Sequence, residues 1–315
     1  MTRNEKILAL CNLKGKGLEI GPSFNPVLPK ASGYDIETLD HATKDELIKK
    51  YTAHNVPIHN IEDVDYIWHG GSYTDAIGKN SVFDYIIASH VIEHTTDIIG
   101  FFHDCMHLLK PDGILSLVIP DKRRCFDFFR PVSTVANAIN SYLTKPNRHD
   151  LGTTCEHFLN AAAVDGSIAF GLADTADMAL VHNYDEVNSI INVYNTSPEY
   201  IDIHHWVFTK ASFELLIYDL QYLGYLPVMR IAHTFDTEGI EFFVSIQKSN
   251  NLPLSPNSEY RLSLLLRIER ELSQASHEKK FGDHLQRRAN THVKSLQRKL
   301  LSRLWNAAAK PKGPK

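Results

Sequence analysis

The apolar run FDYIIAS at residues 83–89 constrains the fold more than any other stretch of this sequence. Hydrophobic residues follow one another there without alternation, so both faces of the strand must be buried, as in the central strands of parallel sheets. A second such run, GILSLVIPD at 113–121, comes after an amphipathic helical pattern at 97–110. Strands that alternate with helices imply a parallel sheet with right-handed crossovers. The sequence therefore predicts an α/β fold.

Shorter segments extend this pattern on both sides. A helix is predicted to begin after Thr43, because Glu46 stands three residues further on and completes a capping box. The other predicted elements are strands at 17–21, 34–40 and 64–71, a helix at 5–13, a short strand and a helix within 204–225, and an antiparallel pair at 227–235 and 239–248. Together they predict a Rossmann-like, doubly wound, mostly parallel seven-stranded sheet.

The alternation of strands and helices is interrupted between residues 127 and 205, where the chain is rich in aromatic, His and Asn residues. We interpret this segment as a helical cap inserted over the carboxyl edge of the sheet. The predicted organisation is a sheet domain at 1–126 and 206–248, the cap at 127–205, a linker at 249–258 and a basic amphipathic helical tail at 259–315.

The net charge of −4 conceals a division of charge along the chain. Residues 261–315 hold 14 Lys and Arg against 4 Asp and Glu, whereas residues 1–260 are strongly acidic. Apolar residues recur at helical spacing in the basic stretch, with Trp305 near its end. We expect this helix to pack on its own domain or on a second copy in a homodimer. Peripheral contact with the inner face of an anionic membrane, or with a polyanion, is the alternative.

The sequence also bears on where the protein works. Its apolar runs are far shorter than the roughly 20 residues that cross a membrane, and its start lacks the apolar core and cleavage site of a signal peptide. The four cysteines are scattered and form no CxxC pair. A cytoplasmic protein with reduced thiols is the expectation that follows.

Polar residues stand at the ends of the predicted strands. In doubly wound sheets, ligands bind beyond the carboxyl ends of the strands, near the point where strand order reverses. Asp40 ends the second strand, 19 residues after Gly21, where an acid can accept hydrogen bonds from two ribose hydroxyls. The other residues at strand ends are Glu19 and Gly21 after the first strand, Ser89 and His90 after the fourth, and Asp121 after the fifth.

The turn LEIGPSFNP at 18–26 carries only one glycine. A dinucleotide-binding turn has three, which let the N-terminus of the next helix approach a pyrophosphate. Pro22 and Ser23 stand where the second glycine would be expected. The turn therefore argues against a nicotinamide-dependent oxidoreductase, which is kept as an alternative, and favours a nucleoside cofactor without phosphate.

Four motifs in order, LEIGPS, ETLD, FDYIIASHVIEH and LLKPDGILSLVIPD, resemble those of the class I S-adenosylmethionine-dependent methyltransferases, and most closely the branch that acts on small molecules and glycans. The resemblance covers 15–121 well and 206–247 loosely. It implies S-adenosylmethionine as cofactor, Glu19 near the methionyl ammonium group, Gly21 beside the same tail and Asp40 on the ribose. It further implies that Gly71 and Ser72 lie beside the adenine, and that Ser89 and His90 flank the methionine and the reaction centre.

Methyl transfer is an in-line displacement that depends mainly on positioning, and a hydroxyl acceptor also needs a general base. His90, Asp121 and His157 are the candidate bases; His94 and the pair His204 and His205 are further possibilities. Both histidines also have a possible structural role. His94 would pack on the sheet at the start of a helix, and His157 would be a structural histidine of the cap. Arg123 and Arg124 follow the fifth strand and either bind an anionic substrate group or form a solvated turn.

The remaining motifs argue against other classes. His103 and His107 have the i, i+4 spacing of metal ligands, but the apolar stripe of their helix leaves them facing water, so no metal site is predicted. The chain lacks the Pro-Pro-aromatic run and the Pro-Cys nucleophile of nucleic-acid methylases, so no specific nucleic-acid substrate is expected. Similar EIGPS turns occur in methyltransferases of bacterial glycan synthesis, which favours O-methylation of a small molecule or sugar in polysaccharide biosynthesis. A non-catalytic binding module is the third alternative.

Overall fold

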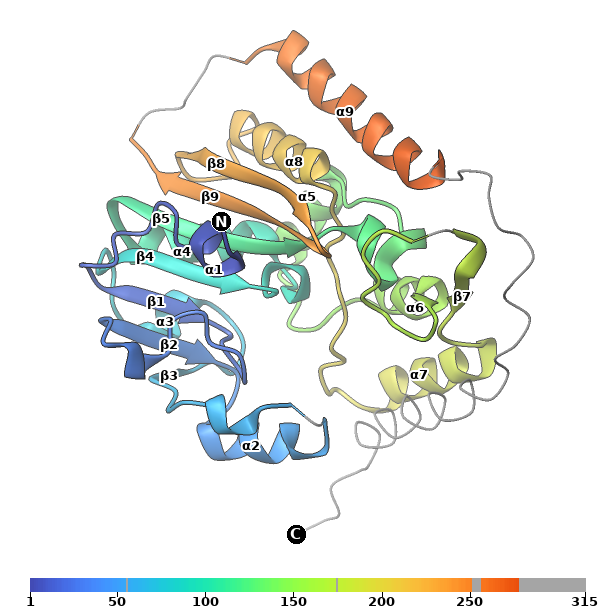
Figure 1. The fold of residues 1–315 in the computed structure, drawn as a ribbon, viewed down its shortest axis with the longest axis horizontal. Helices are drawn as coiled ribbons and strands as arrows, with labels where there is room; N and C mark the ends of the chain where they lie inside the picture. Colours follow the sequence, from blue (N-terminus) through green and yellow to red (C-terminus); the bar gives the residue numbers. More distant parts are fainter. Residues whose placement is uncertain (55, 174, 251–255, 278–315) are drawn as a thin grey trace.

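The computed structural model describes residues 1–54, 56–173, 175–250 and 256–277 (Figure 1). Seven strands in this part of the chain form one sheet in the order β3-β2-β1-β4-β5-β9-β8. β1 to β5 run parallel, and β9 and β8 complete the sheet as an antiparallel pair. The strands are β1 (Gly17–Ile20), β2 (Ile36–Asp40), β3 (Tyr66–Ile67), β4 (Phe83–Ser89), β5 (Leu109–Pro120), β8 (Met229–Glu238) and β9 (Glu241–Lys248). The predicted doubly wound, seven-stranded sheet is confirmed.

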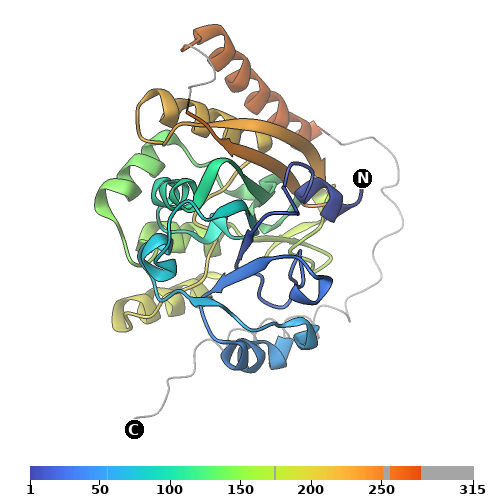
Figure 2. The same ribbon diagram turned by 90° about the vertical axis from the view of Figure 1, so that its left-hand side faces the viewer.

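Alternate residues of the central strands point to opposite faces of the sheet. On one face, Leu18 and Ile20 of β1 join a core that is closed by α3 (Tyr73–Ile77), α4 (Ile98–Leu108) and α8 (Lys210–Tyr222). On the other face, a smaller core is closed by α1 (Arg3–Ile7) and by Val27 and Leu28 of the loop after β1. Figure 2 shows α1 beside the β8–β9 hairpin.

Capping residues set the helix boundaries that the sequence indicated. Thr43 caps α2 (Lys44–Tyr51) in a reciprocal pair with Glu46, as predicted. Thr209 caps α8 in the same way with Ser212. Because Thr209 turns the chain into α8 so early, the strand expected before that helix is reduced to one parallel bridge between Phe208 and Asp121, which corrects that prediction.

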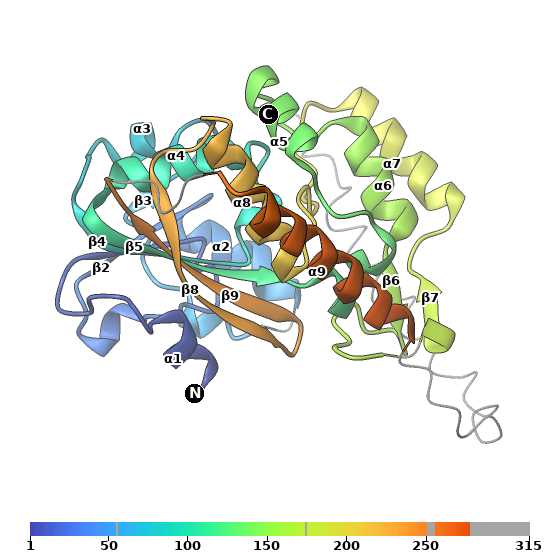
Figure 3. The same cartoon turned by 90° about the horizontal axis from the view of Figure 1, so that it is seen from above.

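The segment 127–205 lies beyond the carboxyl ends of the parallel strands (Figures 1 and 3). It holds α5 (Val135–Thr144), α6 (Leu151–Asn160), a small hairpin of β6 (Ala162–Val164) and β7 (Met178–Leu180), and α7 (Tyr184–Thr196). α5 packs against α4 and α8 of the sheet domain. The boundary drawn at residue 127 therefore remains an interpretation.

The helix α9 (Ser258–His277) packs on α8 through the buried side chains of Leu264 and Ile268. Two ion pairs support this contact, from Arg261 to Asp219 and from Arg267 to Glu214. The first part of the predicted tail thus covers its own domain, whereas its basic part, 278–315, and linker residues 251–255 lie outside the described residues. None of the described helices combines the length and apolar character that crossing a bilayer requires.

The connection from β1 to β2 contains no α-helix: residues 21–35 are all described, and they hold only a 3-10 turn at Lys30–Ser32. Gly21 starts this loop in the left-handed region, with φ +65°, and its N–H donates to the carbonyl of Leu39 at 2.8 Å. A Cβ at this position would stand 2.9 Å from Cγ2 of Val91. Gly21 is thus required both by the backbone angle and by the close approach of Val91.

The carboxylate of Glu19 holds the far end of the same loop. Its oxygens accept the backbone N–H groups of Val27 at 2.7 Å and Leu28 at 3.1 Å, and the residue is 1% exposed. Burial raises the pKa of Glu19 to about 7, although the two backbone hydrogen bonds act in the opposite direction. The side chain of Glu19, a buried residue of β1, therefore holds the loop after β1 in place through these two hydrogen bonds.

Replacing Gly21 with Ala should lower the free energy of unfolding by about 1–3 kcal/mol, because the new methyl group combines an unfavourable φ with a collision against Val91. Gly78→Ala is the matched control, since Gly78 has φ +66° and nothing within 4 Å of its added Cβ. Denaturant unfolding of both variants separates the two effects. Equal losses in the two variants would contradict a role for the Val91 contact.

Glu19 should make the protein less stable as pH rises. Its pKa is higher in the folded state than its ordinary 4.5, so between pH 4.5 and about 7 the folded protein keeps a proton that the unfolded chain has released. The free energy of unfolding should therefore fall relative to Glu19→Gln by up to about 1.4 kcal/mol per pH unit in that window, and then level off. Unfolding curves of the two proteins that stay parallel from pH 5 to 8 would contradict this expectation.

Candidate functional site

The point where strand order reverses lies at β1. The chain leaves β1 for β2 and β3 on one side and returns to β4 on the other, so the carboxyl ends of β1 and β4 border one crevice. Glu19, Gly21, Ser89 and His90 all lie at this edge, as their strand-end positions predicted. Their contacts with the cofactor stay predictions, and both oxygens of Glu19 already accept backbone N–H groups.

Asp40 lies at the end of β2 and is 3% exposed. One carboxylate oxygen accepts the N–H of Ser23 at 3.0 Å, and the other accepts the N–H of His41 at 2.7 Å and lies 2.6 Å from its Nδ1. Pro22, Ser23, Pro26 and Asp40 line a small cavity here. A ribose at Asp40 would therefore share this carboxylate with the turn after β1.

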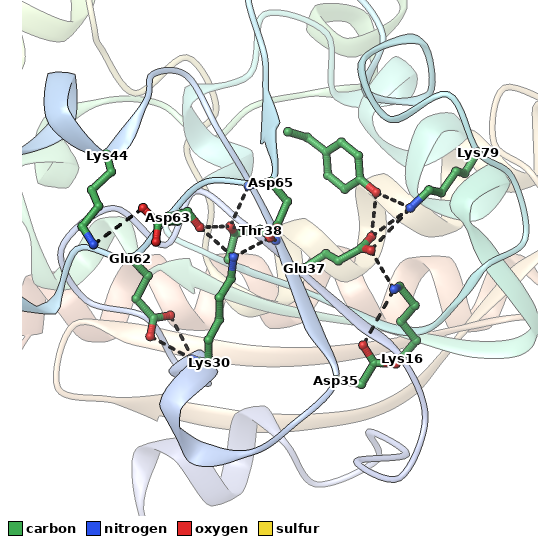
Figure 4. Close-up of polar contacts among 11 residues, drawn as sticks. Lys16, Lys30, Asp35, Glu37, Thr38, Lys44, Glu62, Asp63, Asp65 and Lys79 are labelled. Carbon is green, nitrogen blue, oxygen red and sulfur yellow. Dashed lines mark hydrogen bonds and ion pairs between the residues drawn. The ribbon is translucent and has the colours of Figure 1, made fainter.

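Polar contacts hold the loops that contain Lys30 and Asp65 against each other and against Thr38 of β2 (Figure 4). Asp65 accepts the N–H of Thr38 at 2.7 Å and Nζ of Lys30 at 2.6 Å, and the carboxylate of Glu62 accepts the N–H of Lys30. Burial would raise the pKa of Asp65, but the bonds from Lys30 and Thr38 outweigh it and lower that pKa. The ionised Asp65 thus ties the loops at 30 and 65 to β2.

Gly71 and Ser72, predicted beside the adenine, lie after β3. Ser72 is the N-cap of α3, and its hydroxyl bonds to Asp104 at 2.7 Å. Gly71 has φ +78° with open space around it, and its carbonyl accepts Nε1 of Trp68 at 3.0 Å. Ser72 therefore has a structural role in addition to any contact with the cofactor.

His90 has a positive φ of 54° and belongs to a charged network. Its Nε2 lies 2.6 Å from Glu241, and its Nδ1 lies 3.3 Å from Glu93. Arg3 of α1 binds Glu241 through two nitrogens and donates to the hydroxyl of Ser89 at 2.8 Å. Burial would lower the pKa of His90, but Glu241 and Glu93 raise it to about 9. His90 is thus held as a cation, which is unfavourable for a general base.

Asp121 is fully buried, and both of its carboxylate oxygens accept hydrogen bonds. Arg123 binds both oxygens, at 2.8 and 2.5 Å, and the hydroxyl of Thr237 donates to one of them at 2.6 Å. These bonds fix the turn after β5. Neither Asp121 as a base nor Arg123 as an anion-binding group is free for the role that the sequence suggested.

A second set of polar residues, here called the buried polar cluster, lies where β4 meets the cap. Its members are Glu93, Asp127, Arg130 and His204, which are buried, and His94 and His157, which are half-buried. Asp127 bonds to Nδ1 of His204 at 2.5 Å and to Arg130 at 2.7 Å. Burial would raise the pKa of Asp127, but His204 and Arg130 lower it. Three residues of the cluster have buried polar atoms without a hydrogen-bond partner among the described residues: both carboxylate oxygens of Glu93, Nε of Arg130 and Nδ1 of His157.

His157 joins the cluster from α6, and its ring lies 6.2 Å from that of His204 between centroids. Burial lowers the pKa of His157 to about 3, so its imidazole is neutral at ordinary pH. Of the predicted bases, His157 belongs to the cluster and His90 contacts its member Glu93, whereas Asp121 is engaged elsewhere. Sequence reasoning placed Glu93 in the FDYIIASHVIEH motif without giving it a role, and missed Asp127 and Arg130, whose spacing carries no ligand-binding pattern.

A match to a known family agrees with this architecture. Residues 3–166, more than half of the 315-residue chain, match the family described as "Methyltransferase domain". A search of curated proteins found no match. Among solved structures, the chain is similar to a SAM dependent methyltransferase from Aquifex aeolicus, with 12% identity, 78% of this chain and 89% of that chain covered, and a TM-score of 0.39. It is also similar to a putative S-adenosylmethionine dependent methyltransferase from Listeria monocytogenes, with 8% identity, 78% and 97% covered, and a TM-score of 0.41.

The residues at the sheet edge fit S-adenosylmethionine. The turn after β1 leads into no α-helix whose N-terminus could hold a phosphate, and Asp40 offers a carboxylate at the end of β2 for a ribose. Together with the family match, these features show that the chain belongs to the methyltransferase domain family and is a class I S-adenosylmethionine-dependent methyltransferase.

Proposed function

We propose that the protein methylates an oxygen atom of a small molecule or sugar that binds between the carboxyl ends of β4 and β5 and the segment 127–205. The observation that carries this proposal is the buried polar cluster, which lies beside the predicted cofactor site and retains polar atoms without partners. Such groups are unfavourable in a folded protein unless a ligand completes them. A hydroxyl-rich acceptor is the chemistry that matches them.

By position, His157 is the best candidate for the general base, and with a pKa lowered to about 3 by burial it becomes an effective base only when the bound acceptor and cofactor stabilise its protonated form. Its Nδ1 is buried and has no hydrogen-bond partner among the described residues, in contrast to the paired nitrogens of His90 and the paired oxygens of Asp121. S-adenosylmethionine supplies an electrophilic methyl group on a sulfonium, whose C–S electron pair returns to sulfur as the acceptor oxygen bonds to carbon. His157 takes the proton that the acceptor hydroxyl releases, and Glu19, Gly21 and Asp40 hold the cofactor.

A sugar acceptor in polysaccharide biosynthesis is part of this proposal, and the EIGPS turn is what favours it. A cytoplasmic location is supported by the cysteines, all four of which are unpaired in the structure. Three exposed leucines of α9 (Leu262, Leu265 and Leu266) provide an apolar surface for a homodimer contact.

Cofactor binding should depend on Asp40. Calorimetric titration with S-adenosylmethionine should show binding to the unaltered chain and a loss of at least about tenfold in Asp40→Ala, because hydrogen bonds to a buried carboxylate disappear. Asp84→Ala is the control, since Asp84 lies at the opposite end of the sheet, where it pairs with Lys110. Absence of binding to the unaltered chain, or equal losses in both variants, would contradict the assigned site.

Turnover should depend on His157 without a change in cofactor affinity. Methyl transfer to a panel of hydroxyl acceptors, followed as S-adenosylhomocysteine release, should fall about 10²- to 10⁴-fold in His157→Gln. His182→Gln, which removes another histidine of the cap, should leave the rate unchanged. Transfer to amines instead of hydroxyls would refute O-methylation, and full activity of His157→Gln would refute the base.

A further inference from the structure

Three side chains of the buried polar cluster converge on one point. A carboxylate oxygen of Glu93, a ring nitrogen of His94 and a ring nitrogen of His204 all lie within 4.8 Å of one another. Glu93 is 0% exposed, and among the described residues neither of its oxygens has a hydrogen-bond partner. The nearest ring nitrogens are Nδ1 of His90 at 3.3 Å and Nε2 of His94 at 4.0 Å. The charged His90 ring thus lies on one side of this carboxylate, whose oxygens lack hydrogen bonds and can bind a further cation.

The two histidines of this group are oriented by carboxylates on their outer sides. Nδ1 of His94 lies 2.8 Å from Asp202, and Nδ1 of His204 lies 2.5 Å from Asp127. In each ring the carboxylate contacts Nδ1, so Nε2 is the nitrogen that can bind another partner. Metal-binding histidines are typically held in this way, with the second ring nitrogen bonded to a carboxylate.

Backbone contacts fix the three residues with respect to one another, although His204 is far away in the sequence. The carbonyl of Glu93 accepts the N–H groups of His205 at 2.7 Å and Trp206 at 3.1 Å, so His204 enters the site directly before two residues anchored on Glu93. The carbonyl of His204 accepts Nη1 of Arg130 at 2.7 Å. The hydroxyl of Tyr200 donates to the carbonyl of His94 at 2.9 Å.

We propose that Glu93, His94 and His204 bind one divalent transition-metal ion. Two imidazoles and one carboxylate suit Zn²⁺, Mn²⁺ or Fe²⁺ better than Mg²⁺ or Ca²⁺, which prefer all-oxygen sites. Small side-chain rotations would bring the three atoms to the roughly 2.0–2.2 Å of zinc–ligand bonds. Three protein ligands leave at least one coordination position open, as in catalytic rather than structural sites.

The open position gives the ion a role that rests on the proposed function. An acceptor hydroxyl bound there would be oriented toward the end of β4 and would ionise more easily, because a divalent cation lowers the pKa of a bound O–H group. The released proton would pass to His157, and no oxidation or reduction is involved. The ion would thus select acceptors that present a hydroxyl oxygen.

The experiment uses the untagged full chain, freed of metal with a chelator and titrated calorimetrically with Zn²⁺, with Mn²⁺ and Mg²⁺ as comparison ions. One equivalent of Zn²⁺ should bind and raise the melting temperature. Glu93→Gln and His204→Gln should each weaken that binding at least tenfold. Asp202→Asn should weaken it about 10- to 100-fold through His94. The Asp202 side chain is 63% exposed, so this variant should fold even if the buried variants do not.

The matched control is the double variant His103→Gln/His107→Gln. These two histidines are exposed at i, i+4 on α4, a spacing that metal-binding pairs also have. Zn²⁺ binding should be unchanged in this variant. Stoichiometric binding that survives Glu93→Gln and Asp202→Asn, or that disappears in the control, would overturn the proposal, as would no binding to the unaltered chain.

These titrations contain neither cofactor nor acceptor, so they separate the metal site from O-methylation. Zn²⁺ binding without transfer to any hydroxyl would support the site and refute the proposed function. S-adenosylmethionine binding with hydroxyl transfer that persists in the chelated protein would refute the metal site alone.

Discussion

The hydrogen bonds from His205 and Trp206 to the carbonyl of Glu93 join the two halves of the molecule. They connect the segment after β4 to the chain where it returns from the cap. Trp206 is buried, and its Nε1 donates to the carbonyl of Thr95 at 2.7 Å, which fixes the returning chain a second time. The buried polar cluster exists because of this junction: without it, the side chains of the cap would not lie next to those that follow β4.

The turn after β1 explains why the fold holds this cofactor and not a dinucleotide. In a dinucleotide-binding domain, a helix begins at this turn and directs its N-terminal N–H groups at phosphate. Here the loop is instead fastened by carboxylates, Glu19 at one end and Asp40 at the other. A loop held in this way presents no helix N-terminus to a pyrophosphate. The family match and this geometry agree against the oxidoreductase alternative.

Much of the sheet could be predicted because its determinants are local. FDYIIAS is apolar on both faces, and the Thr43 and Glu46 pair is visible as a capping box, so β4 and the start of α2 follow from neighbouring residues. The prediction of a strand before α8 was wrong, because Thr209 caps the helix and leaves only one β-bridge before it.

The candidate site was harder to predict because its residues come together only through tertiary contacts. Strand-end positions identified Asp40 and His90 correctly as edge residues, since parallel strands end at one edge. The same reasoning gave no indication that Arg123 would bind the carboxylate of Asp121. It also did not indicate that Asp127 would bond to His204, 77 residues further along the chain. No sequence period links such partners, because the intervening cap determines where the chain returns.

The buried polar cluster is unfavourable for stability by itself. Removing ionised groups such as Glu93, Asp127 and Arg130 from water costs several kcal/mol per charge, and incomplete hydrogen bonding leaves part of that cost without compensation. His90 adds backbone strain of about 1–3 kcal/mol through its positive φ. A purely structural junction could be built from apolar residues at less cost, as the α4–α8 side of the same sheet is. The retention of charge, strain and unpaired atoms at one place, beside the cofactor edge, is therefore best explained by a ligand that completes them.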